Sequence, residues 1–304
     1  MSADSPVKPQ PARYGEVFDR GYKHYDGPRL GRPQAVRSLI GYSMKRAMGI
    51  RKSWTAKILP FLLYTAAVIP LVVMIGVDAL VPDFNFASYS GYIQWTFVIV
   101  GIFVAMSAPE MLCVDRRERI LPLYFSRAIA RFDYVFPKIA AMTLLTMTLS
   151  LVPSVILWLG RQLTSDSVWQ AMKDNIGDLG RIILLGTVIA LVLGTGGLVI
   201  SSFTDRKGVA IIVILIGVII LTGMANGAAE LLEDYEWSRY FILLSLPDTF
   251  VAISNHLFHD VNLSNNWIIA HSDLSLGFYL GYMAALVIIG VLILRWRYSP
   301  RDES

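Results

Sequence analysis

The chain is poor in cysteine and in charge. Its 304 residues include a single cysteine, Cys113, so an internal disulfide and a cysteine-based zinc site are both excluded. Only 16% of the residues are charged and 55% are hydrophobic, whereas soluble globular chains carry roughly 25% charged residues. These figures also exclude a disordered, a collagenous and a disulfide-rich chain. The composition therefore indicates an integral membrane protein with ordinary polar loops.

Motifs that would mark an enzyme are missing as well. The chain has no P-loop for ATP, no Gly-x-Ser-x-Gly nucleophile elbow and no His-Glu-x-x-His zinc motif. Among its histidines, His256 and His259 are three residues apart, and His271 follows. A metal site on these residues is conceivable, but polar residues beside a membrane are the commoner explanation. We therefore expect no catalytic, cofactor-binding or metal-binding residue in this chain, and no nucleic-acid partner.

Six apolar runs are candidates to cross about 30 Å of hydrocarbon as helices. They are Ile58–Val77, Ile93–Ser107, Ile139–Gly160, Ile182–Phe203, Val209–Ala225 and Leu276–Leu294. The second run is short unless its helix starts near Tyr89 or continues toward Leu112. None of the six contains Asp, Glu, Lys, Arg or His, although proton- and sodium-coupled carriers usually place ionisable residues at this depth. A transporter of this composition would therefore take its energy from outside the membrane.

Lysine and arginine are distributed unequally between the two sides of these spans. Of the 27 basic residues, 23 lie before the first span, after the sixth, or in the loops that follow the second and fourth spans. The other side holds Arg161, Lys173, Arg181 and Arg239. By the positive-inside rule, both termini are predicted to be cytoplasmic. The loops predicted to face outward are Asp78–Tyr92, Arg161–Arg181 and Asn226–Ser275.

The last outer segment, residues 226–275, is long and partly apolar. Within it, Phe241–Phe258 could be mistaken for a seventh span, but Pro247-Asp248 interrupts the run. A seventh span would also move the basic C-terminal residues to the outside. The sequence therefore favours re-entrant or interfacial helices before the last span. Four aromatic residues are predicted to lie at headgroup depth: Trp237, Tyr240, Phe241 and Trp267.

The region before the first span divides into two parts. Residues 1–32 are rich in proline, glycine and charge, and are predicted to be a cytoplasmic tail, extended or ordered only against a partner. Residues 33–57 are predicted to form a basic amphipathic helix on the inner leaflet. Its apolar positions are Val36, Leu39, Ile40, Met44, Ala47 and Trp54, and its charge comes from Arg37, Lys45, Arg46, Arg51 and Lys52. This helix either only anchors the chain to anionic lipid or also contacts a cytoplasmic partner.

Small and hydroxyl residues recur at helical spacing within the spans. The small residues are spaced by four in three places: Gly186, Ala190 and Gly194; Gly197 and Ser201; Gly223 and Gly227. Such stripes let helices approach closely. Four hydroxyl residues of the third span fall on about one face: Thr143, Thr146, Ser150 and Ser154. That face either packs against another helix or forms the polar wall of a translocation path.

The loop between the second and third spans, residues 108–138, combines mixed charges with apolar residues. Ser107 is predicted to cap a short cytoplasmic helix, which would end near Leu121 because Pro122 follows. The charged residues of this helix are Glu110, Asp115, Arg116, Arg117, Glu118 and Arg119. Leucines and aromatic residues follow them, which a loop that only oriented the chain would not need. The combination suits docking to another protein.

Two stretches of this loop resemble the coupling region of bacterial type-2 ABC-transporter permeases. The first is Asp115-Arg116-Arg117-Glu118 followed by Leu121-Pro122-Leu123-Tyr124-Phe125-Ser126-Arg127, and the second is Arg131-Phe132-Asp133-Tyr134-Val135 with Lys138. That family commonly shows an acidic–basic run, a Leu-Ser-Arg-Pro-type stretch, an Arg-x-Asp-Tyr and a lysine. Ala128 stands where the family has a proline after Ser-Arg.

The resemblance implies both a fold and a mechanism. The fold would be an all-α integral membrane protein in which residues 58–304 form six transmembrane helices, together with the cytoplasmic amphipathic helix, a cytoplasmic coupling helix and the outer re-entrant helices. Two permease subunits, identical or paralogous, would form the pathway in a bacterial inner membrane. Separate ABC ATPase subunits would bind ATP and Mg, contact Glu110 and residues 115–119, and drive export. The alternative is a non-transporting membrane anchor or regulatory subunit of a larger complex.

Overall fold

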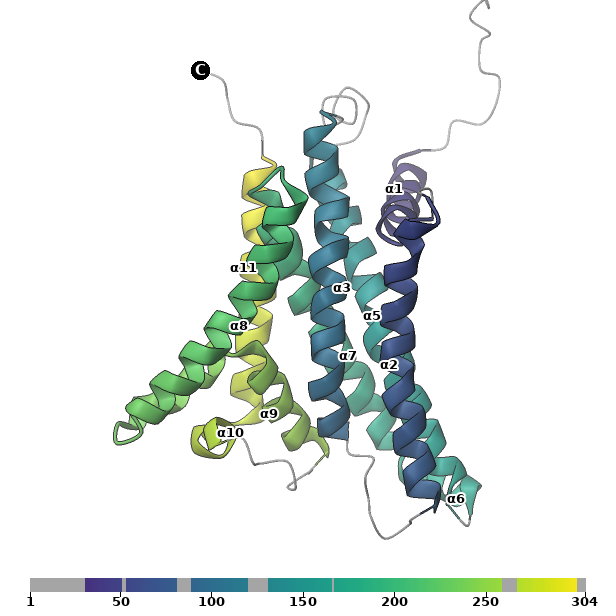
Figure 1. The fold of residues 1–304 in the computed structure, drawn as a ribbon, viewed down its shortest axis with the longest axis vertical. Coiled ribbons are helices and arrows are strands. Elements are labelled where there is room, and N and C mark those ends of the chain that lie inside the picture. Colours follow the sequence, from purple (N-terminus) through teal and green to yellow (C-terminus); the bar gives the residue numbers. More distant parts are fainter. Residues whose placement is uncertain are drawn as a thin grey trace, which may run out of the picture.

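The structure is a computed structural model that describes residues 31–50, 53–80, 89–119, 131–165, 167–258 and 267–299. These residues form helices joined by turns and short connections (Figure 1). Six of the helices are long and apolar enough to cross a membrane: α2 (Thr55–Leu80), α3 (Tyr89–Arg117), α5 (Arg131–Leu163), α7 (Ile176–Ser202), α8 (Lys207–Leu231) and α11 (Leu276–Arg297). The prediction of a helical, multi-pass membrane protein is confirmed.

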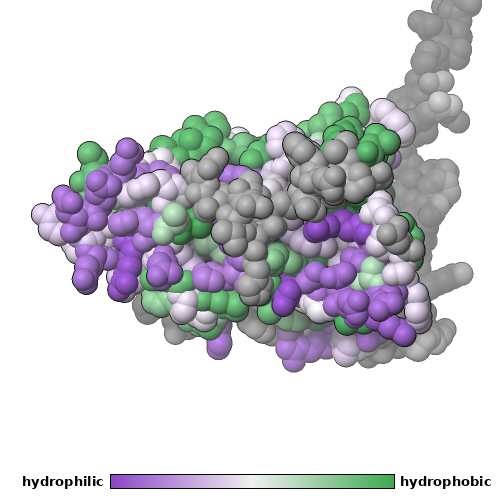
Figure 2. All heavy atoms as spheres, turned by 90° about the horizontal axis from the view of Figure 1, so that it is seen from below, coloured by the Kyte–Doolittle hydropathy of each residue, from purple (hydrophilic) through white to green (hydrophobic). Residues whose placement is uncertain are grey.

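The shorter helices lie toward the two ends of these spans (Figure 1). α1 (Arg32–Ala47) lies at the end where α11 finishes, which we call the α1 end. Toward the opposite end lie α6 (Val168–Asp174), the 3₁₀ helix η2 (Glu236–Leu244), α9 (Leu246–Phe258) and α10 (Trp267–Ser272). Figure 2 views the molecule from that opposite end, where hydrophilic residues gather toward the two sides and hydrophobic side chains show along the margins.

Two helices at the α1 end differ from their predicted bounds. The helix predicted to start at Ser107 is wrong as a separate element, because α3 runs without a break from Tyr89 to Arg117 and Ser107 is buried inside it. The amphipathic helix predicted over residues 33–57 is too long: α1 ends at Ala47, and Gly49 turns the chain with a φ of +68° before α2 begins. Residues other than glycine rarely adopt that conformation, which explains the stop.

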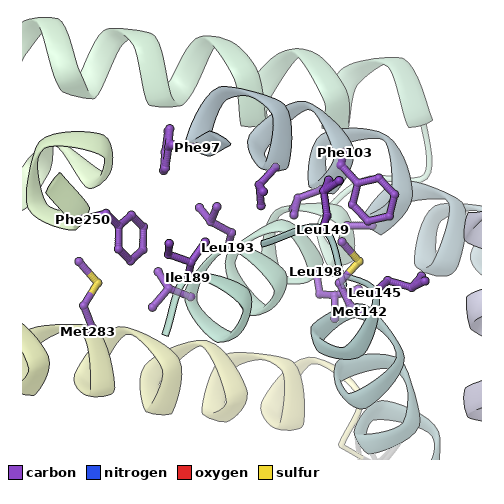
Figure 3. Packing of buried hydrophobic residues seen from close by; sticks show 14 of the residues in the cluster. Phe97, Phe103, Met142, Leu145, Leu149, Ile189, Leu193, Leu198, Phe250 and Met283 are labelled. Carbon is purple, nitrogen blue, oxygen red and sulfur yellow. The ribbon is translucent and has the colours of Figure 1, made fainter. Parts of the chain in front are cut away.

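The centre of the bundle is formed by α3 and α7. In the most apolar stretch of each span, 72% of α3 and 61% of α7 are buried, against 17% for each of α2, α8 and α11. Figure 3 shows side chains of this core, with Phe103 of α3, Leu149 of α5 and Leu193 of α7 among them. The peripheral spans therefore leave most of their aliphatic surface for lipid or for another protein.

Glycines decide where the central helices touch. A Cβ added at Gly186 of α7 would overlap Leu151 of α5, and one at Gly197 would overlap Val104 of α3. The predicted close approach is therefore confirmed at these two positions, where a larger residue would require the facing side chain to move. Within the described part of this chain the same prediction is wrong for Gly223 and Gly227 of α8, because a Cβ on either would meet open space.

The segment 241–258 is not one straight span. η2 and α9 meet at an angle of 107°, with Ser245 between them. The hydroxyl of Ser245 donates to Asp248 at 2.5 Å and accepts the Asp248 backbone N–H at 3.4 Å, so the Ser245 side chain caps the start of α9. Asn226 of α8 donates to the same carboxylate at 2.9 Å. The predicted interruption is thus confirmed, two residues earlier than Pro247.

Candidate functional site

One face of α1 is buried, and that face includes a charged residue. Its buried residues are Leu39, Ser43, Arg46 and Ala47, whose spacing of four, three and one places them on one side of the helix. α1 packs with this side against α3 and α5. Arg37 and Lys45 lie on the exposed side. Arg46 therefore points into the protein. In a helix that only lay on the inner leaflet, Arg46 would instead point toward the lipid headgroups.

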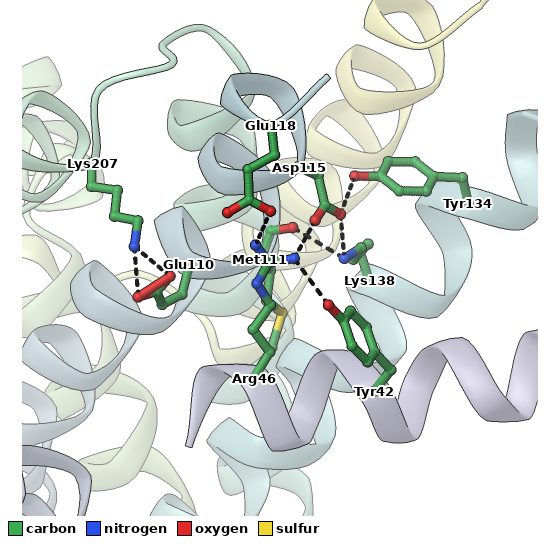
Figure 4. A network of polar contacts seen from close by, with 9 residues as sticks. All are labelled: Tyr42, Arg46, Glu110, Met111, Asp115, Glu118, Tyr134, Lys138 and Lys207. Atoms are coloured by element: carbon green, nitrogen blue, oxygen red, sulfur yellow. Dashed lines mark hydrogen bonds and ion pairs between the residues drawn. The ribbon is translucent and has the colours of Figure 1, made fainter. Parts of the chain in front are cut away.

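Asp115 of α3 is the centre of a buried ionic cluster formed by α1, α3 and α5 (Figure 4). Its fully buried carboxylate accepts hydrogen bonds from Arg46 at 2.5 Å, from Lys138 at 2.8 Å and from the Tyr134 hydroxyl at 2.9 Å. Lys138 also donates to the backbone carbonyl of Met111 at 3.0 Å. Three helices are thus held together by one carboxylate. We call Arg46, Asp115, Tyr134 and Lys138 the Asp115 cluster.

The charges of this cluster are balanced by a carboxylate at its edge. Glu118 accepts from Arg46 at 3.3 Å, and its side chain is 47% exposed while that of Asp115 is 0% exposed. Burial by itself would lower the pKa of Arg46, but Asp115, Tyr42, Glu118 and Glu110 together outweigh this effect and raise the pKa of Arg46 above its ordinary value. Arg46 therefore stays charged, and two cations face two anions across the helix junction.

A second set of contacts ties the same end of α3 to α7, α8 and α11. Glu110 pairs with Lys207 at 2.6 Å, and Arg116 pairs with Asp205 at 3.0 Å. Arg116 also donates to the carbonyl of Ser202, the last residue of α7, and Arg297 of α11 donates to the same carbonyl at 3.4 Å. Two arginines thus satisfy a helix C-terminus that lacks an intrahelical partner. The last two turns of α3 therefore join two groups of helices.

The end of α3 is exposed beyond these contacts, although Glu118 still accepts the 3.3 Å hydrogen bond from Arg46. Arg117, Glu118 and Arg119 are all exposed, and Arg119 has a φ of 53°, which stops the helix. We call these three residues the α3 tip. The tip presents both signs of charge on a helix whose preceding turns are fixed by ion pairs on two sides. A surface of this kind can bind a partner and pass on the displacement that the partner imposes.

The structure separates the six residues predicted to contact an ATPase into two sets. Glu110, Asp115 and Arg116 point inward and bind other helices of this chain, so they are not available to a partner in this conformation. The other three make up the α3 tip, where Glu118 also accepts from Arg46 but keeps 47% of its side chain exposed. Arg51 and Lys52 of the predicted interfacial helix lie outside the described residues, as do residues 120–130 of the predicted coupling loop.

The partners of Asp115 in the cluster could not be identified from the local sequence pattern. Tyr134 and Lys138 stand in the stretch that carries the resemblance, but nothing in their spacing pairs them with Asp115. One feature of the sequence does point to a pairing of Asp115 with Lys138. Both residues stand beside long apolar runs, and a buried Asp or Lys needs a counter-charge. Lys207 is one of the basic residues in the loop after the fourth predicted span, and it pairs with Glu110 of α3, while Asp205 of the same connection pairs with Arg116.

The hydroxyl face of α5 is turned mainly to its own backbone and to α7. Thr146 donates to the Met142 carbonyl at 2.8 Å, and Ser154 donates to the Ser150 carbonyl at 2.8 Å. Ser150 reaches the Gly186 carbonyl of α7 at 3.2 Å. The Thr143 hydroxyl is buried and has no hydrogen-bond partner in the described part of the chain. These contacts favour helix packing over a polar pathway wall for this face.

The histidines toward the opposite end take separate partners. The His256 ring hydrogen bonds with the Leu274 carbonyl at 3.0 Å, and the His271 ring with the Ser238 hydroxyl at 2.7 Å. Trp267 stacks on His271 with the ring centroids 4.7 Å apart. His259 lies outside the described residues. Among the residues that are described, no three His, Cys, Asp or Glu side chains come together in a group that could hold a metal ion.

Comparison with known proteins adds no family assignment. No protein-family model matches the chain, and no curated protein matches it significantly. The features of the chain that bear on its function are therefore the geometry of the α1 end and the resemblance of the loop 108–138 to the coupling region of type-2 permeases.

Proposed function

We propose that this chain is the membrane-spanning permease subunit of an ATP-driven ABC transporter of the type-2 class. In this proposal the chain works as an exporter in a bacterial inner membrane, with both termini in the cytoplasm, and a separate ATPase subunit binds ATP and Mg. A second permease copy or a paralogue completes the pathway. The α3 tip is the contact with the ATPase. Arg117, Glu118 and Arg119 replace the wider set of six residues that the sequence suggests.

The observation that carries the proposal is the way α3 is held just before its exposed tip. The Asp115 cluster fixes the last turns of α3 to α1 and α5, and the pairs Glu110–Lys207 and Arg116–Asp205 fix them to the start of α8. The buried pairs of the Asp115 cluster resist separation, because a buried charge left without its partner is strongly unfavourable, and the partly exposed pairs with Lys207 and Asp205 add to this hold. A push on the tip therefore moves several helices together instead of bending α3 alone.

The distribution of charge also supports a permease that depends on a separate ATPase for its energy. The described spans are apolar in their middle parts, and the chain has no nucleotide-binding motif. The ionic contacts that link distant elements gather instead at the α1 end. Arg32 at the start of α1 adds a further one by binding Asp133 of α5 at 2.5 Å. Energy from a partner would enter where the spans are linked most strongly.

The proposal is tested by purifying the tagged chain from its native membrane in a mild detergent. We expect a P-loop ATPase to accompany the wild type and to hydrolyse ATP. Reversing both basic residues of the tip, with Arg117→Glu and Arg119→Glu, should release that ATPase or uncouple its hydrolysis from transport. The matched control reverses two exposed basic residues outside the α1 end, with Lys173→Glu and Arg239→Glu, and should leave both properties unchanged.

Two results would contradict the proposal. One is the absence of any P-loop ATPase from the purified wild-type complex. The other is a tip variant that binds and stimulates the ATPase as well as the control variant does. A subunit that only anchors a complex would retain its partner in the wild type, yet ATP turnover would not respond to the tip variant.

A further inference from the structure

An apolar groove lies between α3, α7 and α8. It encloses about 1190 Å³, including the space open to the surroundings, and every residue that lines it is apolar or glycine. Its inner wall includes Phe97 and Leu193, which also belong to the buried core (Figure 3). The outer wall is α8, which diverges from α3 and α7 toward the end opposite α1 (Figure 1). The groove is thus a gap beside the core, open to the surroundings of the bundle.

Three glycines keep the groove open. A Cβ added at Gly101 of α3, Gly196 of α7 or Gly217 of α8 would meet no described atom of the chain within 4 Å, and all three residues line the groove. The neighbouring Gly197 behaves differently, because its missing Cβ is what lets α7 touch Val104. The lack of side chains at the three open positions therefore serves no helix contact within this chain. The missing side chains leave space in the groove for a molecule other than this chain.

The depth of the groove indicates what fills it. On α8 the groove is lined from Val213 to Leu221, which begins about 9 Å along the helix from Lys207 and extends for about 12 Å at 1.5 Å per residue. One leaflet contributes roughly 15 Å to a hydrocarbon core of about 30 Å. An apolar space of this kind does not hold water, and the molecules present at this depth are acyl chains. A chain enclosed by three helices gains packing contacts that it lacks among other lipids.

A positive charge lies where the headgroup of such a lipid would be. Arg206 immediately precedes α8 at the α1 end and is exposed, whereas the next residue, Lys207, is paired with Glu110. A phosphate near Arg206 would leave its acyl chain pointing along α8 into the groove. We propose that this groove binds an acyl chain of an anionic phospholipid from the leaflet at the α1 end. The lipid then forms part of the contact between α8 and the rest of the bundle.

The test uses the full chain in vesicles of phosphatidylethanolamine and phosphatidylglycerol. A trace of phosphatidylglycerol carries a diazirine in the middle of one acyl chain, and adducts are mapped by mass spectrometry after illumination. We expect adducts on peptides of all three groove helices. Gly196→Leu and Gly217→Leu should reduce groove labelling to the level seen on the exposed face of α11. Gly223→Leu is the matched control, since it is equally open and on α8 but does not line the groove, and it should label as the wild type does.

A second arm tests the headgroup. Arg206→Glu should remove any preference of groove labelling for phosphatidylglycerol over a phosphatidylcholine probe with the same diazirine. Because the three open glycines lie on three helices, Gly101→Leu replaces either leucine variant that does not fold. The proposal is overturned if adducts are spread evenly over the lipid-facing helices and persist in the leucine variants. It is also overturned if cysteines at Val213 or Ile219 crosslink two copies of the chain, because the groove then holds protein.

Discussion

Replacing Asp115 by asparagine should destabilise the protein far more than removing the second carboxylate that binds Arg46. Asp115→Asn keeps the shape of the side chain but leaves Arg46 and Lys138 facing each other, and the Lys138 side chain is 1% exposed. Removing one partner of a buried ion pair costs about 3–5 kcal/mol. That loss corresponds to a fall in the ratio of folded to unfolded protein by a factor on the order of 100 to several thousand.

Glu118→Gln is the matched control for this variant. Both carboxylates accept from Arg46, but the Glu118 side chain is 47% exposed, so solvent screens its charge. An exposed pair of this kind contributes about 0–1 kcal/mol. Denaturant titration in detergent micelles, followed by helix content, measures both variants under the same conditions. Equal losses for the two variants, or a loss below about 1 kcal/mol for Asp115→Asn, would refute the assignment of Asp115 as the centre of the cluster.

A double variant separates the charge effect from the loss of hydrogen bonds. Lys138→Met removes one of the two cations that Asp115→Asn leaves unbalanced, so the two substitutions together should cost less than their sum. Residues within one ionic network show coupling energies of about 0.5–3 kcal/mol. Strict additivity would mean that Lys138 and Asp115 act independently, which the 2.8 Å contact between them does not allow.

Three further predictions concern other parts of the fold. Gly49→Ala should destabilise the protein by about 1–2 kcal/mol or more, because Gly49 has a φ of +68° and the new Cβ would lie 2.7 Å from the Ala56 carbonyl oxygen. Gly41→Ala is the control, since Gly41 lies on α1 with open space around it. The melting temperature should fall for Gly49→Ala and should not fall for Gly41→Ala. Gly197→Leu should disrupt the contact between α7 and α3, seen as loss of the monodisperse species in gel filtration, whereas Gly223→Leu should be tolerated. The orientation is tested with single cysteines in a Cys113→Ser background. A cysteine in place of Arg206 should react with an impermeant maleimide only from the cytoplasm, and a cysteine in place of Glu233 only from outside. The reverse pattern would contradict the proposed orientation.

The spans could be predicted from the sequence because hydrocarbon imposes a simple rule. A charge-free run of the right length has to form a helix in lipid, so all six candidate spans coincide with helices. The ends of the helices were harder to place. α3 continues past Ser107 because its charged residues find partners in α1, α5 and α8, and partners distant in the sequence leave no local pattern.

The candidate site was predictable only as a region. The sequence shows a dense group of charges after the second span, and a polar group looks the same whether it binds a partner or another helix of its own chain. Asp115 and Arg116 turned inward because counter-charges lie within reach, while Arg117 and Arg119 remained exposed. The stop after Ala47 depended on Gly49, whose positive φ is not visible in the apolar periodicity.

The most direct test of the account is a crosslink from the α3 tip in the native membrane. A photoreactive amino acid in place of Arg117 should form an adduct with a P-loop ATPase, and the same amino acid in place of Lys173 should not. Mass spectrometry of the adducts identifies the partner. An ATPase adduct from Lys173, or a tip that crosslinks only to lipid and to this chain, would contradict the claim that the tip transmits the work of ATP hydrolysis to the spans.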